Sequence, residues 1–219
     1  MEGDFDYQVI LDNLPFLWKG LKLTFLLTGL AIFGGIVLGT LLALARLSPF
    51  KVLSFISASY VNFFRSLPLI LVIFWFYFLV PLIVGRPVGD FYSVLTAFVL
   101  FEAAYYSEII RAGISSVRQD QISASRALGM TYGQSMRFII LPQAFRAMTP
   151  VLLTQAIILF QDTSLVYVVG LKDFLVSAEL IANRDQRLVE MFVFVALVYL
   201  IFCLAGSFAV RLLQRRIAK

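Results

Sequence analysis

The sequence predicts an all-α integral membrane protein with five transmembrane helices. Hydrophobic residues make up 61% of the 219 residues, charged residues make up 14%, and the mean hydropathy is +0.92. A water-soluble domain of this length carries far more charge on its surface, so lipid must be the solvent for most side chains. The chain contains no internal repeat, low-complexity tract or polar linker, and we therefore expect one membrane domain over residues 1–219.

Apolar segments place the five spans at about residues 16–45, 52–84, 91–112, 147–171 and 188–210. The first, second and fifth contain uncharged runs long enough to cross about 30 Å of hydrocarbon as a helix. The third and fourth are also apolar, but they carry the acidic residues Glu102, Glu108 and Asp162.

The second span is too long for a straight crossing, because an unbroken helix over 52–84 would measure about 50 Å. Pro68 offers a break, since proline removes a backbone donor and its ring clashes with the carbonyl of Phe64. Arg65 lies beside this break and is costly in lipid. We therefore expect Arg65 to face protein or a water-filled cavity, either as a structural ion-pair partner or as a substrate contact.

Residues 113–146 form the longest polar stretch, and we expect a cytoplasmic loop that carries function. Asp120 is placed to cap a short helix there, and Gly129 is placed to end it in the left-handed conformation. Pro142 marks a further break before the fourth span.

The distribution of charge predicts the topology. Lys and Arg are more numerous in the segments that lie on the same side as the carboxyl terminus, which places that terminus in the cytoplasm and the amino terminus outside. The acidic start of the chain, with Glu2 and Asp4, lacks the basic flank of a signal peptide, so we expect no cleavage.

Several classes of function are disfavoured by composition. Cys203 is the single cysteine and histidine is absent, so we expect neither an intrachain disulfide nor a metal site. The net charge of +5 is explained by basic loops and a basic tail that meet anionic headgroups, and no nucleic-acid partner is needed.

The loop also carries a motif. Ser123-Ala124-Ser125, Gly129, Ile139 and Pro142 have the spacing of the E-A-A, G, I, P signature of ATP-binding-cassette (ABC) importer permeases, with Ser123 in place of the acidic residue. The flanking segments 101–114, 140–146 and 160–165 extend the likeness. The sequence thus resembles the polar amino acid subfamily of these permeases, and within it the glutamate/aspartate type.

The resemblance implies the type I importer permease fold, a bacterial inner-membrane location and transport by alternating access. It implies two ATP-binding subunits, a second identical or related permease, a periplasmic substrate-binding protein and the lipid bilayer as partners. ATP and Mg would be used by the partner ATPase, with no cofactor on this chain. It also implies that the short helix is a coupling helix, which docks on the ATPase through Ser123, Ala124, Ser125, Arg126, Leu128 and Gly129.

Ionisable and polar side chains inside the spans are the candidate substrate site. Glu102 is about 16 Å from the outer end of its span, close to the midplane. Tyr105 neighbours both Glu102 and Glu108, while Glu108 could instead pair with Arg111. Polar residues also interrupt the fourth span, which lipid tolerates only where they line a cavity; these are Gln161, Asp162, Thr163 and Ser164.

These polar residues also have a structural reading, in which the hydroxyls of Thr163 and Ser164 bond to their own helix and Asp162 pairs with Arg65. The local charges suit an acidic or a basic amino acid, and only the resemblance favours glutamate or aspartate over glutamine or a basic substrate. An intramembrane enzyme and a secondary transporter are the competing classes. The chain lacks a phosphate-binding G-x-x-x-x-G-K-[ST] motif, so ATP hydrolysis must come from a partner.

Overall fold

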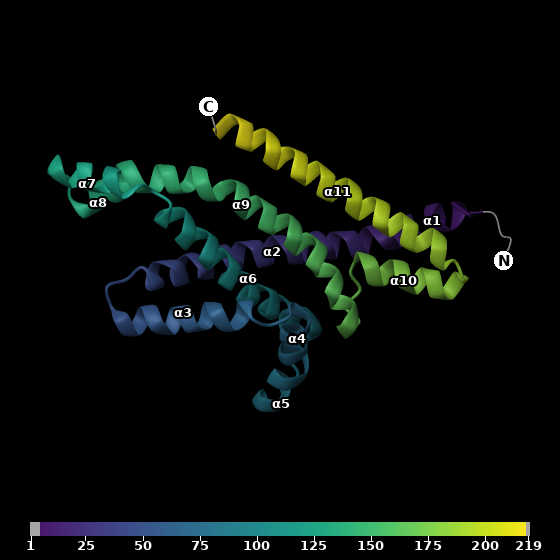
Figure 1. The fold of residues 1–219 in the computed structure, drawn as a ribbon. Helices are drawn as coiled ribbons and strands as arrows, with labels where there is room; N and C mark the ends of the chain where they lie inside the picture. The colour runs from purple at the N-terminus through teal and green to yellow at the C-terminus, as the bar shows by residue number, and fades with distance from the viewer. Residues whose placement is uncertain (1–4, 218–219) are drawn as a thin grey trace.

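The computed structural model describes residues 5–217, and every regular element in that range is helical (Figure 1). A short helix α1 (Gln8–Asp12) precedes α2 (Leu14–Arg46), the first long helix. The other long elements are α6 (Asp90–Ser115), the continuous segment 132–169 and α11 (Leu188–Ile217). Four helices are thus long and apolar enough to span a membrane, or five spans if the bent pair described next counts as one.

The second apolar segment is broken where Pro68 predicts it. Helix α3 (Lys51–Arg65) ends at Arg65, and α4 (Leu69–Phe74) begins directly after Pro68. The two directions differ by 105°, which is a turn of the chain rather than a mild kink. After α4 the chain continues through a π-helical segment η1 (Trp75–Leu79) into α5 (Val80–Val84).

The polar loop is shorter than the sequence suggested. Helix α6 continues to Ser115, and a helix resumes with α8 (Tyr132–Ser135), so only residues 116–131 separate them, with α7 (Gln119–Ala127) between. Pro142 does not break the chain. A π-helical segment η2 (Met136–Ile140) directly precedes α9 (Leu141–Asp162), and its wider turn accommodates a proline that cannot donate a backbone bond.

The C-terminal part of the fourth span leads into a helix that the sequence did not indicate. Helix α9 tightens into the 3-10 segment η3 (Thr163–Val169), which ends at Gly170 in the left-handed conformation. Helix α10 (Phe174–Asp185) follows and packs on α2 and α11. Asp173 caps it by accepting the Val176 N–H at 2.9 Å, while the Phe174 N–H donates to Thr24 of α2 at 3.1 Å.

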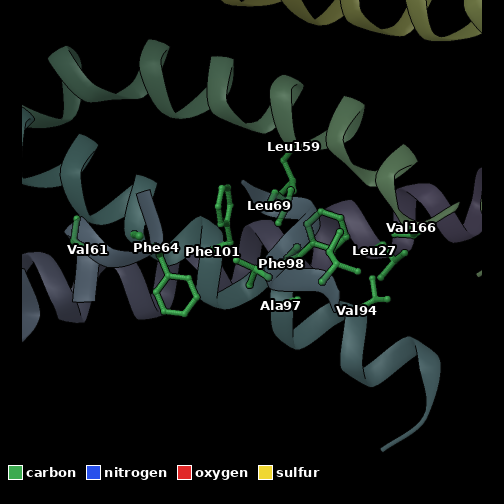
Figure 2. Close-up of a cluster of buried hydrophobic side chains, with 14 residues drawn as sticks. Leu27, Val61, Phe64, Leu69, Val94, Ala97, Phe98, Phe101, Leu159 and Val166 are labelled. Atoms are coloured by element: carbon green, nitrogen blue, oxygen red, sulfur yellow. The ribbon is translucent and has the colours of Figure 1, made fainter. Parts of the chain in front are cut away.

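Close contact between α2 and α6 forms the rigid centre of the fold. A Cβ atom added at Gly39 would lie 2.8 Å from Cβ of Tyr106, and one added at Gly35 would lie 3.0 Å from Cβ of Glu102. Small residues allow this approach, which in lipid depends on van der Waals packing rather than on a hydrophobic driving force. Figure 2 shows the adjoining core, to which α2, α3, α4, α6, α9 and η3 contribute the labelled side chains, such as Leu27, Phe64 and Leu159.

Candidate functional site

A cluster of three arginines surrounds Glu108 in the C-terminal part of α6. Arg46 of α2 and Arg111 of α6 each approach its carboxylate to 2.5 Å, and Arg65 from the end of α3 lies 3.8 Å away. The expected local pair between Glu108 and Arg111 is present. Arg46 was not expected, and the cluster carries two more positive charges than negative ones.

Of the three arginines, Arg65 lies farthest from the Glu108 carboxylate and has the most exposed side chain. Its side chain is 40% exposed, against 13% for Arg46, and its guanidinium lies over the ring of Tyr105 at 5.5 Å from the centroid. One side of Arg65 contacts Glu108 and Tyr105, and the rest of its side chain is exposed. Within residues 5–217 its carboxylate partner is Glu108 and not Asp162, so the alternative pairing with Asp162 is not observed.

Glu102 is fully buried in the middle of α6. Its two carboxylate oxygens both accept from Nε2 of Gln155 on α9, at 3.2 Å each. No cation pairs with Glu102 among the described residues. One neutral hydrogen-bond partner offsets only part of the free energy that is needed to bury a carboxylate. Gln155 was not identified from the sequence. Its signal is an amide side chain within an apolar segment, seven residues before Asp162 and so on the same face of the helix.

The polar sequence 161–164 coincides with the change from α-helix to 3-10 helix at Thr163. Thr163 donates its hydroxyl to the Phe160 carbonyl at 2.7 Å, and Ser164 donates to the Gln161 carbonyl at 2.8 Å. These hydroxyls therefore already bond to their own helix. Gln161 donates from Nε2 to Sγ of Cys203 on α11 at 3.3 Å.

Two further polar groups lie beside Glu102 and Glu108 on α6. The hydroxyls of Tyr106 and Ser107 are buried and have no hydrogen-bond partner among the described residues. Buried polar groups are normally paired, so this part of α6 has unused hydrogen-bonding capacity next to the acidic residues. The sequence had directed attention to Tyr105 instead, which is half-buried and packs on Phe101 with ring centroids 5.1 Å apart.

Helix α7 ends in a hydrogen-bonded turn at Gly129. Gly129 has a φ of 77°, as predicted, and the two bonds of a Schellman motif end the helix: Met130 N–H to the Ser125 carbonyl at 3.1 Å and Gly129 N–H to the Arg126 carbonyl at 2.9 Å. The Ser125 hydroxyl contacts that of Ser135 at 2.8 Å, which fixes α7 against α8.

The outer surface of α7 is open to contact. Leu128 is 81% exposed, and Ser123, Ala124 and Arg126 are also exposed, while Ser125 is buried. Asp120 does not cap α7, because the helix already starts at Gln119 with Arg118 as its cap residue; Asp120 pairs with Arg118 at 2.7 Å instead. An exposed leucine at the end of a short helix that is fixed to its neighbour is suited to docking on another protein.

Comparison with known proteins identifies the architecture. Residues 35–219 match the family model of the binding-protein-dependent transport system inner membrane component. The chain belongs to this family. Membership confirms the all-helical permease fold and the multi-pass inner-membrane location. A permease of this family works with a substrate-binding protein and with an ATPase subunit, and ATP hydrolysis resides in that partner subunit.

Individual relatives of this permease cover nearly its whole length. It is 50% identical to the glutamate/aspartate import permease protein GltK of Escherichia coli O6:H1, over 98% of this chain and 99% of that one. It is 35% identical to the probable glutamine ABC transporter permease protein GlnM of Bacillus subtilis, over 97% and 98%. A crystal structure of an amino acid ABC transporter with histidines superposes with a TM-score of 0.92, at 31% identity over 99% and 100% of the two chains.

Proposed function

We propose that this permease imports acidic amino acids, glutamate or aspartate, by alternating access driven by the partner ATPase. The observation that carries the proposal is the 50% identity to a glutamate/aspartate permease over almost the full length of both chains. The charges of the site support it, because an acidic amino acid brings two carboxylates and one ammonium group.

Opposite charges in the site match these groups. Glu102 and Asp162 are acidic groups near the middle of the membrane, where an incoming ammonium group would stabilise their charged forms. Arg65 supplies the cation for a carboxylate. Because Arg46 and Arg111 remain bonded to Glu108 at 2.5 Å, Arg65 is able to leave that carboxylate without exposing it unpaired. Tyr105 and Glu108 complete the proposed lining on α6. Gln161, Thr163 and Ser164 would join it on releasing their present partners, which are Sγ of Cys203 and carbonyl groups of their own helix.

The same proposal assigns the topology and the assembly. The amino terminus lies in the periplasm and the carboxyl terminus in the cytoplasm, as the basic residues indicate. Two permease copies, identical or related, and two ATP-binding subunits form the complex. The exposed residues of α7 (Ser123, Ala124, Arg126, Leu128) together with Ser125 and Gly129 couple nucleotide-driven closure to the membrane helices.

Uptake by Arg65→Gln tests whether Arg65 contacts the substrate, and uptake of different amino acids by the parental transporter tests the substrate class. The transporter is reconstituted in proteoliposomes with its ATPase, and ATP-driven uptake of labelled glutamate is measured at saturating binding protein, so that delivery is constant. Loss of a charge-assisted bond of about 1.5–3 kcal/mol predicts a fall of roughly 10- to 150-fold in the maximum rate. Lys51→Gln, at the opposite end of the same helix, is the charge-matched control and should transport normally.

Two results would contradict the proposal. Parental glutamate uptake by a fully assembled Arg65→Gln transporter would remove Arg65 from the substrate path. ATP-driven uptake of glutamine or arginine without uptake of glutamate or aspartate would overturn the acidic substrate class, whatever the effect of Arg65.

A further inference from the structure

An apolar groove of 430 Å³ lies between α9 and α11, with a contribution from α2. Leu153 and Ile157 form part of the α9 wall, and Ala209 and Leu213 form part of the α11 wall. None of the proposed substrate or coupling residues lines it. Its walls belong to helices long and apolar enough to span the membrane. The groove is therefore filled by a lipid or by part of another membrane protein.

Aromatic side chains close the groove at one end. Phe160 is the lining residue nearest the end of α9, and Phe202 is the one nearest the start of α11. Both pack with Phe25 of α2, with ring centroids 5.2 Å and 5.1 Å from it, and with each other at 5.9 Å. An occupant therefore enters from the other end or from the side.

Arginines continue the two walls at the opposite end. Arg146 lies seven residues before Leu153, and Arg216 lies seven residues after Ala209, so each is on the helix face that lines the groove. Both arginines are exposed, and neither forms an ion pair within residues 5–217. The apolar groove therefore ends at a positively charged site formed by Arg146 and Arg216.

Helix geometry gives the length of this arrangement. Fourteen residues separate Phe160 from Arg146, and fourteen separate Phe202 from Arg216, so both walls run about 21 Å from the aromatic end to an arginine. One bilayer leaflet with its headgroups is about 20–22 Å deep. A single leaflet lipid thus spans the distance with its chain end at the aromatics and its phosphate at the arginines.

We propose that the groove between α9 and α11 binds an anionic phospholipid, with an acyl chain along Leu153, Ile157 and Leu213 and the headgroup between Arg146 and Arg216. The inference rests on the topology proposed above, which places these arginines at the cytoplasmic leaflet, where anionic lipids attract basic residues. It does not depend on the substrate of the transporter. A zwitterionic lipid also offers a phosphate, but its ammonium group adds a third positive charge beside the two guanidinium groups, so a lipid with net negative charge is favoured.

Native mass spectrometry of the purified complete transporter tests this site. The complex is equilibrated with equal amounts of phosphatidylglycerol and phosphatidylethanolamine, and retained lipid is counted per permease. We expect preferential retention of phosphatidylglycerol. Arg146→Gln and Arg216→Gln should each lower that preference about fivefold. Arg215→Gln is the matched control, because its side chain projects about 100° away from that of Arg216 around the helix and removes the same charge.

A second variant separates the groove from surface charge. Ala209→Phe places a ring in the groove from an exposed position and should abolish retention of the lipid while both arginines remain. Retention that is unchanged in Ala209→Phe and in both arginine variants would overturn the proposal. So would a disulfide between two permease copies through Ala209→Cys in a Cys203→Ser background, because a protein would then occupy the groove. Neither result would alter the substrate assignment, which is tested by uptake.

Discussion

Replacing Gly129 tests whether α7 is the element that couples this permease to its ATPase. The residue has a φ of 77°, and no atom lies within 4 Å of a Cβ built on it. Substitution therefore costs backbone strain and not a steric clash with neighbours. For an L-residue that strain is about 1–2 kcal/mol, and it is larger for a β-branched side chain.

If Gly129→Val escapes the strain by leaving the left-handed region, it loses the two hydrogen bonds that end α7. At about 1 kcal/mol each, their loss costs roughly the same 2 kcal/mol, which is about a 30-fold change in the equilibrium between the formed and unformed turn. Gly129→Asn should be milder, because asparagine enters the left-handed region more readily. Gly133→Ala is the control: its Cβ also meets open space, but its backbone is helical.

Co-purification of the ATPase and ATP-driven uptake are the two measurements. Both should fall together in Gly129→Val, partly recover in Gly129→Asn and stay at the parental level in Gly133→Ala. Membrane insertion should be equal in all three, since the spans are distant from the change. A Gly129→Val permease that retains its ATPase and transports at the parental rate would show that α7 does not couple through this turn.

Three further outcomes are expected. A reporter fused after Lys219 should be cytoplasmic and one fused before Met1 periplasmic, and a cytoplasmic amino terminus would refute the five-span topology. Glu102→Gln and Asp162→Ala should each lower the maximum uptake rate more than the apparent affinity, because the binding protein selects substrate first; parental rates in assembled complexes would make both residues structural. Burial raises the pKa of Asp173 to about 6 from 3.8, so its charged form opposes folding, and stability of the purified complex should fall as pH rises from about 4 to 6. Asp173→Asn should flatten that fall, and an unchanged profile would contradict the assignment.

Features set by local chemistry were predictable from the sequence. Pro68 breaks the second segment because its ring and missing donor act on adjacent turns, and Gly129 ends α7 because few other residues adopt its φ. The apolar runs likewise mark the helices through their own composition. Each of these needs no knowledge of distant parts of the chain.

Features set by helix pairing were not predictable. Arg46 reaches Glu108, and Gln155 reaches Glu102, only because α2, α6 and α9 pack in one register. The length of the polar loop was overestimated for a different reason. Pro142 indicates a helix break, but the π-helical turn before it removes the need for one, and sequence spacing does not reveal that turn.

The contacts around Glu108 come from two kinds of element, the closely packed pair α2–α6 and the more loosely attached α3. Arg46 and Arg111 hold Glu108 from α2 and α6, and these two helices are joined so closely at Gly39 that a single added methyl would meet a side chain 2.8 Å away. Arg65 instead reaches the cluster from α3, just before the 105° turn into α4. Movement of Arg65 away from Glu108 therefore leaves the packing of α2 on α6 unchanged. Loss of Arg46 would instead remove one of the two short ion pairs of Glu108. Arg65 is for this reason the member of the cluster that we propose exchanges Glu108 for a substrate carboxylate while the α2–α6 centre stays assembled.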